Sequence, residues 1–118
     1  MTQFEEKVFN AVKLIPKGKV TTYGAIACYL GIPKGARAIG NALHKNPTPI
    51  VIPCHRVVNS RGMLAKAFVF GGEGVQESFL KADGVSVENG AVDLVKHGWF
   101  FEKNNKKARE SSRAFKFS

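Results

Sequence analysis

Residues 22–44, TYGAIACYLGIPKGARAIGNALH, contain two short helical patterns separated by a tight turn. Thr22 is suited to cap a first helix over residues 23–30, and Gly31 with the proline two positions later interrupts that pattern. A second helix is expected over about residues 34–44, with its apolar residues on one face. Two short helices joined in this way are typical of a helix-turn-helix, whose second helix is the recognition element. An ordinary helical corner has the same pattern, so this alternative stays open.

The charge of the chain favours a polyanionic partner. The 118 residues include 18 Lys+Arg and 9 Asp+Glu, a net charge of +9. No carboxylate lies between Lys7 and Lys66, and a segment that is basic throughout favours nucleic acid. A charge that serves only solubility usually mixes both signs. Lys34 and Arg37 lie near the start of the expected recognition helix, where such helices contact DNA.

The remaining segments predict one small, mainly helical domain. A chain of this length suits a single domain. Helices are expected over residues 3–15, where Thr2 and Glu5 form a capping box, and over residues 75–82. A turn signal within residues 57–64 predicts a β-hairpin, a possible wing beside the helices. The predicted fold class is therefore mainly α with a small β-hairpin, a winged helix-turn-helix-like domain.

Two further segments and the extent of the domain are also predicted. Residues 50–52 are expected to form a short buried strand, and the aromatic residues 99–101 are expected to pack on the core. The domain is expected to span residues 1–102. Residues 103–118 are polar, basic and without periodicity, which predicts a disordered tail.

Several protein classes are disfavoured. No apolar run approaches the ~20 residues of a membrane span, and no signal-peptide pattern is present, so we expect a cytoplasmic or nuclear protein without a membrane partner. Free thiols are expected at Cys28 and Cys54, with Cys28 an inert, buried one. The cysteines and the three histidines lack the paired spacing of zinc ligands, so no metal site is expected.

The segment PCHRVV at residues 53–58 carries the chemistry. Cys54 follows an apolar run and precedes His55 and Arg56. A thiol acts as a nucleophile in its thiolate form, which a nearby base or positive charge produces. A buried, unreactive cysteine fits the same residues, because neighbours in sequence need not face one another.

Four segments then carry a resemblance to a known family. They are residues 16–24 (PKGKVTTYG), 36–43 (ARAIGNAL), 46–49 (NPTP) and 52–58 (IPCHRVV). Their order and spacing are similar to those of the C-terminal domain of the O6-alkylguanine-DNA alkyltransferases, the methylated-DNA–protein-cysteine methyltransferases. The Pro-Cys-His-Arg-Val piece is highly specific.

The resemblance implies DNA repair by direct, stoichiometric transfer of an alkyl group from O6-alkylguanine in duplex DNA after base flipping. It implies that Cys54 accepts the alkyl group and that His55 deprotonates it through a water. Asn46 matches the asparagine that braces the active-site turn, and Asp83 stands where the family has a glutamate that orients the histidine. No cofactor is implied, and the protein is consumed by one reaction.

The resemblance also implies how DNA is bound. Tyr23 matches the tyrosine that contacts the extruded base, and Arg37 matches the arginine that fills the vacated stack. The other DNA-binding candidates are Thr22, Lys34, Ala36, Asn41 and Arg56. We expect a monomer whose partner is double-stranded DNA that contains O6-alkylguanine.

Two departures point to a rival interpretation. Residues 63–70 differ from the family's pocket loop, and residues 84–99 resemble the end of the alkyltransferase-like proteins. Those proteins bind O6-alkylguanine and flag it for nucleotide excision repair proteins, and they usually have tryptophan in place of the nucleophile. Because Cys54 is present, we favour the single-turnover methyltransferase. The sensor is the alternative, and a winged-helix DNA-binding module with an inert thiol is a third.

Overall fold

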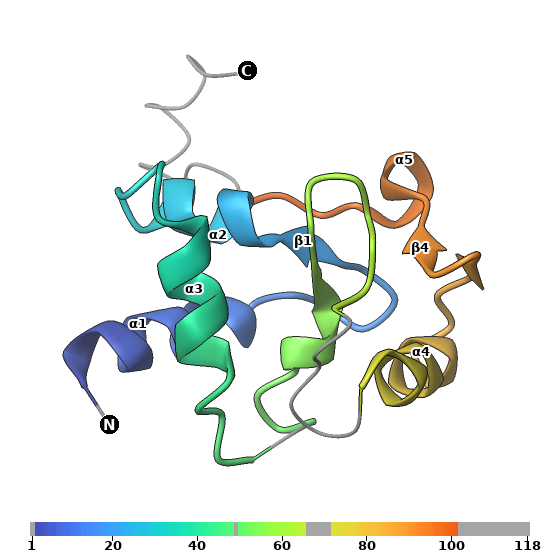
Figure 1. Ribbon diagram of the computed structural model, residues 1–118, viewed down its shortest axis with the longest axis horizontal. Helices are drawn as coiled ribbons and strands as arrows, with labels where there is room; N and C mark the ends of the chain where they lie inside the picture. The colour runs from blue at the N-terminus through green and yellow to red at the C-terminus, as the bar shows by residue number, and fades with distance from the viewer. Residues whose placement is uncertain (1, 49, 66–71, 102–118) are drawn as a thin grey trace.

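The computed structural model describes residues 2–48, 50–65 and 72–101 (Figure 1). The elements are α1 (Gln3–Val12), β1 (Thr21–Thr22), α2 (Tyr23–Tyr29), α3 (Ala36–Leu43), the 3-10 turn η1 (Cys54–Arg56), β2 (Val57–Val58), α4 (Glu73–Ala82), β3 (Val87–Glu88), β4 (Ala91–Val92) and α5 (Leu94–His97). In Figure 1, α1, α2 and α3 form one side of the domain, and α4, β4 and α5 form the other. The predicted mainly helical fold is confirmed.

The predicted helix starts are well placed. Thr2 and Glu5 form the capping box, because each side chain accepts a hydrogen bond from the other residue's backbone N–H, at 3.0 and 3.1 Å. Thr22 caps α2 by accepting a hydrogen bond from the N–H of Ala25 at 3.0 Å. α1 is shorter than predicted and ends at Val12, although Ile15 in the following turn is still buried.

The strands pair differently from the prediction. The turn predicted within residues 57–64 forms, because the N–H of Asn59 donates to the carbonyl of Met63 at 3.1 Å. Its two arms pair with other segments, however: β2 runs parallel to β1, with Thr21 opposite Val57, and Met63 forms an isolated bridge with Ala91. Both valines of β2 are fully buried, which suits a strand between two layers better than a wing. The hairpin of the fold lies at β3 and β4, joined by Asn89 and Gly90, which both have positive φ, as its tight turn requires.

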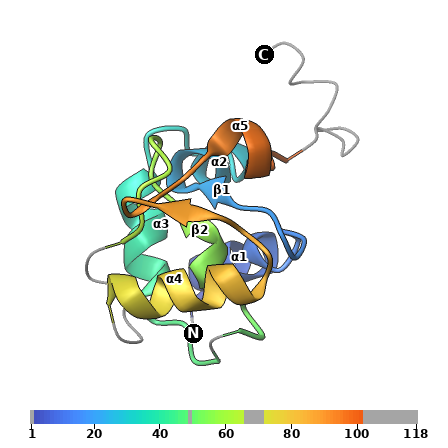
Figure 2. The ribbon, with the colours of Figure 1, turned by 90° about the vertical axis from the view of Figure 1, so that its right-hand side faces the viewer.

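The core consists of two clusters on either side of β1 and β2. The first joins α1, α2 and α3 and includes Cys54, and the second is formed by Val20, Val58, Leu64, Leu80, Val85 and Val92. In Figure 2, α4 and the β3–β4 hairpin lie on the side that faces the viewer, with α1 and α3 behind them.

Three predictions about burial are wrong. Ile50 and Val51 lie in a turn with 60% and 69% of their surfaces exposed, and of this run only Ile52 is buried. The prolines that flank the run favour a turn, so its apolar character does not indicate a strand. Cys28 is exposed because it lies on the outer face of α2, next to the buried Ala27. Phe100 is exposed as well, between neighbours that pack on the core.

The end of the described chain supports α2. The N–H of Val20 donates to the carbonyl of His97 at 3.0 Å, and the N–H of Trp99 donates to the carbonyl of Val20 at 2.7 Å. The ring of Phe101 then stacks on that of Tyr29, with 4.3 Å between ring centroids. The predicted boundary at residue 102 and the tail lie outside the described residues. Within those residues, no helix is long and apolar enough to cross a membrane.

Candidate active site

The buried side chain of Asn46 fixes the turn that carries Cys54. Its Nδ2 donates to the carbonyl of Ile52 at 2.8 Å and to Sγ of Cys54 at 3.2 Å. Its Oδ1 accepts from the N–H of Thr48 at 2.9 Å. Asn46 therefore ties both arms of the proline-rich loop together and points a donor at the sulfur, where it stabilises negative charge.

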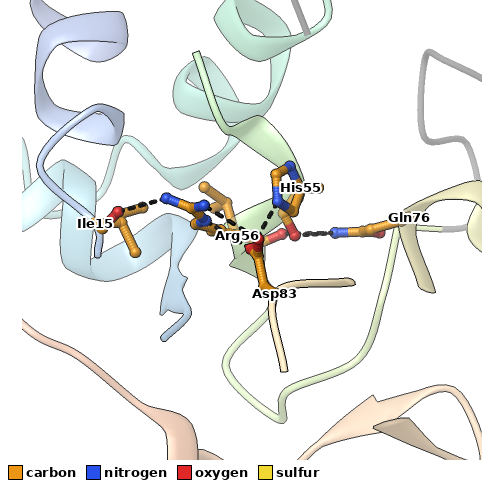
Figure 3. A network of polar contacts seen from close by, with 6 residues as sticks. Ile15, His55, Arg56, Gln76 and Asp83 are labelled. Atoms are coloured by element: carbon orange, nitrogen blue, oxygen red, sulfur yellow. Dashed lines mark hydrogen bonds and ion pairs between the residues drawn. The ribbon is translucent and has the colours of Figure 1, made fainter. Parts of the chain in front are cut away.

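Asp83 connects the active-site turn with α4 (Figure 3). It is the C-cap of α4, and its Oδ2 lies 2.9 Å from Nε2 of His55. Arg56 donates to the same carboxylate from Nε at 2.7 Å and from Nη2 at 3.2 Å. The aspartate thus reaches the histidine despite being one methylene shorter than the family's glutamate.

The tautomer of His55 follows from this contact. An ionised carboxylate only accepts hydrogen bonds, so Nε2 of His55 carries the proton that Asp83 accepts. The other ring nitrogen, Nδ1, is buried and has no hydrogen-bond partner among the described residues. In the neutral ring Nδ1 is an acceptor, and it is therefore the nitrogen that can take a proton.

Burial controls the protonation states of this site. It raises the pKa of the Cys54 thiol, an effect that the hydrogen bond from Asn46 reduces but does not cancel. Burial also lowers the pKa of His55, against the effect of Asp83. The pKa of Asp83 is lowered, because hydrogen bonds from Arg56 and His55 outweigh the effect of burial. The resting site therefore holds a thiol, a neutral imidazole and a carboxylate near neutral pH.

Tyr23 and one face of α3, along its whole length, form a separate, outward-facing surface. Tyr23, Ala36, Arg37, Gly40, Asn41 and His44 line one concave region. Tyr23 also packs against the core cluster that contains Cys54. Burial raises the pKa of Tyr23, and the nearby Cys54 adds a smaller increase. Tyr23 is thus close to Cys54 and also lines the concave surface. Lys34 is exposed in the turn before α3.

Two of the predicted DNA-binding residues have structural roles. Thr22 is buried and caps α2. The guanidinium of Arg56 is held by Asp83 and by the carbonyl of Ile15, to which Nη1 donates at 2.9 Å. Direct DNA contacts of Thr22 and Arg56 remain predictions.

Comparison with known proteins places the chain in a family. Residues 3–85 match the 6-O-methylguanine DNA methyltransferase, DNA binding domain. The chain belongs to this family. It is 44% identical over 87 residues to alkyltransferase-like protein 1 of Schizosaccharomyces pombe, a match that covers 74% of this chain and 81% of that protein. It is 43% identical over 83 residues to a methylated-DNA–protein-cysteine methyltransferase of Methanosarcina acetivorans, covering 70% of this chain and 52% of that protein.

Solved structures of the methyltransferase family agree with this assignment. The S. pombe Atl1 structure in complex with damaged DNA containing O6-carboxymethylguanine has a TM-score of 0.74 at 40% identity, over 84% of this chain and 96% of that one. The Mycobacterium tuberculosis OGT structure in complex with DNA has a TM-score of 0.67 at 37% identity, over 71% of this chain and 50% of that one. The chain spans most of the alkyltransferase-like protein but about half of these methyltransferases.

Two residues of this methyltransferase-family domain were not predicted from the sequence. Gln76 is fully buried beside the active-site turn, and the available signal was a polar residue on the apolar face of the helix at residues 75–82. His44 lines the concave surface with Arg37, and its place seven residues after Arg37, two helical turns along, was the signal. Within the described residues, no three His, Cys, Asp or Glu side chains are grouped so that they could hold a metal ion.

Proposed function

We propose that this protein repairs O6-alkylguanine in duplex DNA by moving the alkyl group to Cys54, as a single-turnover methylated-DNA–[protein]-cysteine S-methyltransferase. One observation carries the proposal. Sγ of Cys54 accepts a hydrogen bond from Asn46 in the same turn that presents His55, hydrogen-bonded to Asp83. An inert structural thiol needs neither a buried amide donor nor an oriented imidazole beside it.

The chemistry follows from the protonation states. The thiol proton passes to Nδ1 of His55, and Asp83 stabilises the imidazolium that forms. The thiolate attacks the alkyl carbon, so a sulfur–carbon bond forms while the bond between that carbon and O6 breaks. The electron pair stays with guanine, which takes up a proton. The thioether has no group that water can displace, so the protein is not regenerated.

The surface of α3 supports the DNA side of the proposal. O6 of guanine is shielded within the duplex, so the damaged nucleotide must rotate out to meet a buried sulfur. Tyr23 lines the concave surface and packs against the core cluster that includes Cys54, and it would contact the extruded base. Arg37, exposed at the start of α3, would fill the space that the base leaves, and Lys34, Ala36 and Asn41 would contact the neighbouring backbone.

Mass spectrometry tests the proposal. The protein is incubated with a duplex that carries one O6-methylguanine. Its intact mass is measured before and after the incubation, and the modified peptide is then mapped. We expect a gain of one methylene on Cys54 and none on the exposed Cys28. An unchanged mass would contradict the transfer.

A damage sensor is the second candidate. Two observations favour it: the chain covers 96% of the Atl1 structure with damaged DNA and 81% of alkyltransferase-like protein 1. A sensor would bind the O6-alkylguanine duplex more tightly than the undamaged one, keep its mass, and present the complex to nucleotide excision repair proteins. Equal affinity for both duplexes would leave only a general DNA-binding module.

A further inference from the structure

The side chain of Gln76 makes three hydrogen bonds inside the domain. Its Nε2 donates to the carbonyl of His55 and to the carbonyl of Val57, each at 3.1 Å. Its Oε1 accepts from the N–H of Ala65 at 2.8 Å. Gln76 is fully buried in the first half of α4, and Figure 3 shows its amide directed at the backbone of His55.

These contacts join three segments that are distant in the sequence. The carbonyls of His55 and Val57 belong to η1 and β2, on either side of Arg56, whereas Ala65 begins the connection toward α4. α4 also carries Asp83 at its end. The helix therefore holds the active-site turn at two points: through the backbone at Gln76 and through the imidazole at Asp83.

The backbone contact bears on the direction of the imidazole. Because a 3-10 turn has few internal hydrogen bonds, its carbonyls are free to be held from outside. The amide of Gln76 fixes the His55 carbonyl, while the ring of Phe79 meets the imidazole at an interplanar angle of 72°. A turn that shifted by a fraction of an ångström would move Nδ1 relative to the sulfur, and such shifts are costly to reaction rates.

We propose that Gln76 is a positioning residue for the transfer reaction: its amide donors set the orientation of His55 toward Cys54. This inference rests on the proposed function. It assigns no contact between Gln76 and the alkylated base, because the residue acts through the backbone of the turn.

Two substitutions distinguish the two hydrogen bonds that Gln76 donates from the one that it accepts. Gln76→Glu has nearly the same shape and keeps an acceptor for Ala65, but it cannot donate to the two carbonyls. Gln76→Met has a similar length and loses all three contacts. Ser78→Ala, on the exposed face of the same helix, is the matched surface control. Val92→Ala, in the second core cluster, is a control for loss of stability alone.

The first readout is the rate constant of methyl transfer at saturating lesion DNA, measured where every variant is fully folded. We expect both Gln76 variants to lower it about tenfold or more, while lesion affinity stays within about threefold. The two controls are expected to react like the unsubstituted protein. Normal transfer rates in Gln76→Met would overturn the proposal, and normal rates in Gln76→Glu alone would assign the effect to the Ala65 contact and overturn the role of the donors.

A second readout does not depend on DNA repair. In a Cys28→Ser background, the rate of Cys54 alkylation by iodoacetamide is followed as a function of pH. If Gln76 orients the imidazole of His55, the Gln76→Met variant shifts the pH dependence of the alkylation rate to higher pH. An unshifted pH dependence contradicts the proposal. Absence of methyl transfer in the unsubstituted protein would instead refute the proposed function, so the two failures are distinguishable.

Discussion

The active-site turn and the recognition helix differ in how many of their polar contacts the protein itself supplies. Around Cys54, the polar side chains are buried or largely buried and are bonded to one another: Asn46 to the sulfur, and Asp83 to both His55 and Arg56. On α3, Arg37 and Asn41 are exposed, and the described residues show no hydrogen bond or ion pair for either side chain. The reactive groups are thus ordered before DNA arrives, whereas the contacts of the DNA-binding surface remain to be made.

This difference separates two kinds of expected effect. Substitutions in the turn should change the chemical step or the stability of the fold and leave DNA affinity nearly intact. Substitutions on α3 should change binding and base extrusion and leave the turn unaltered.

Cys54→Ala should abolish methyl transfer, because the only proposed acceptor of the alkyl group is lost. Its affinity for the O6-methylguanine duplex should stay within about threefold, since truncation to Ala leaves the α3 surface in place. Transfer is measured by protein mass and affinity by fluorescence anisotropy. Cys28→Ser is the control and should transfer normally. Retained transfer in Cys54→Ala would place the acceptor elsewhere.

Asp83→Asn should slow transfer about 100-fold and cost about 3 kcal/mol in the free energy of unfolding. It removes the charge that Arg56 and His55 share, and it leaves the guanidinium without its anion. Denaturant unfolding and single-turnover kinetics measure the two effects. Glu77→Gln, which breaks an exposed ion pair with Lys81 on the same helix, should cost about 0.5 kcal/mol or less. Equal losses of transfer rate and of unfolding free energy in Asp83→Asn and Glu77→Gln would contradict the role given to Asp83.

Arg37→Ala should reduce transfer from duplex DNA about tenfold and leave transfer from the free O6-methylguanine base unchanged. The free base needs no extrusion, so a group that fills the vacated stack has no task there. Quenched-flow measurements on the two substrates give the ratio. Lys13→Ala, another exposed cation, is expected to change neither rate. Equal loss on both substrates would place Arg37 in the chemical step.

Acid should destabilise the fold through His55 and Asp83. The pKa of His55 is lowered by burial, so the unfolded state takes up a proton first as the pH falls below about 6.5. The pKa of Asp83 is also lowered, despite its burial, by Arg56 and His55, so its contribution is lost at still lower pH, below about 4. Stability measured by denaturant at several pH values should therefore fall in both windows. In Asp83→Asn, the loss of stability below about pH 4 should be smaller than in the unsubstituted protein.

Removal of residues 103–118 should have the smallest effect, a shallower salt dependence of DNA binding. This segment has six basic residues and one acidic residue, and each phosphate contact contributes about 0.9 to the slope of log K against log salt. Anisotropy titrations at several salt concentrations measure the slope. The methyl-transfer rate at saturating DNA should not change. An unchanged slope would mean that the tail makes no phosphate contacts.

Local signals in the sequence predicted much of the fold and of the site. The capping threonines and the turn at residues 31–35 are set by neighbouring residues, and they place α1, α2 and α3 correctly. The strand pairing was not predictable in this way, because β1 and β2 lie 36 positions apart (57 minus 21) and pair in parallel. The Asn89-Gly90 turn was a better hairpin signal than the turn at residues 59–62.

The site divides along the same line. The motif indicated Cys54 and His55. The resemblance supplied Asn46, which contacts Cys54 from eight positions away, and Asp83, which reaches His55 from a distant helix. A polar residue on the apolar face of its helix marked Gln76 as unusual, but its role depends on carbonyls about 20 positions away, which no spacing reveals. The partial burial of Arg56 was missed for a similar reason, since a charge in a basic segment indicates an exposed position until Asp83 is placed beside it.

The most direct test of the account follows both products of one reaction in time. The protein is mixed with an equimolar O6-methylguanine duplex, and the methylation of Cys54 and the return of unmodified guanine in the DNA are quantified together. Direct transfer to Cys54 predicts that the two products appear at the same rate and that the reaction stops at one methyl group per protein. A tight complex in which the lesion persists and Cys54 stays unmodified would contradict it and identify the protein as a sensor.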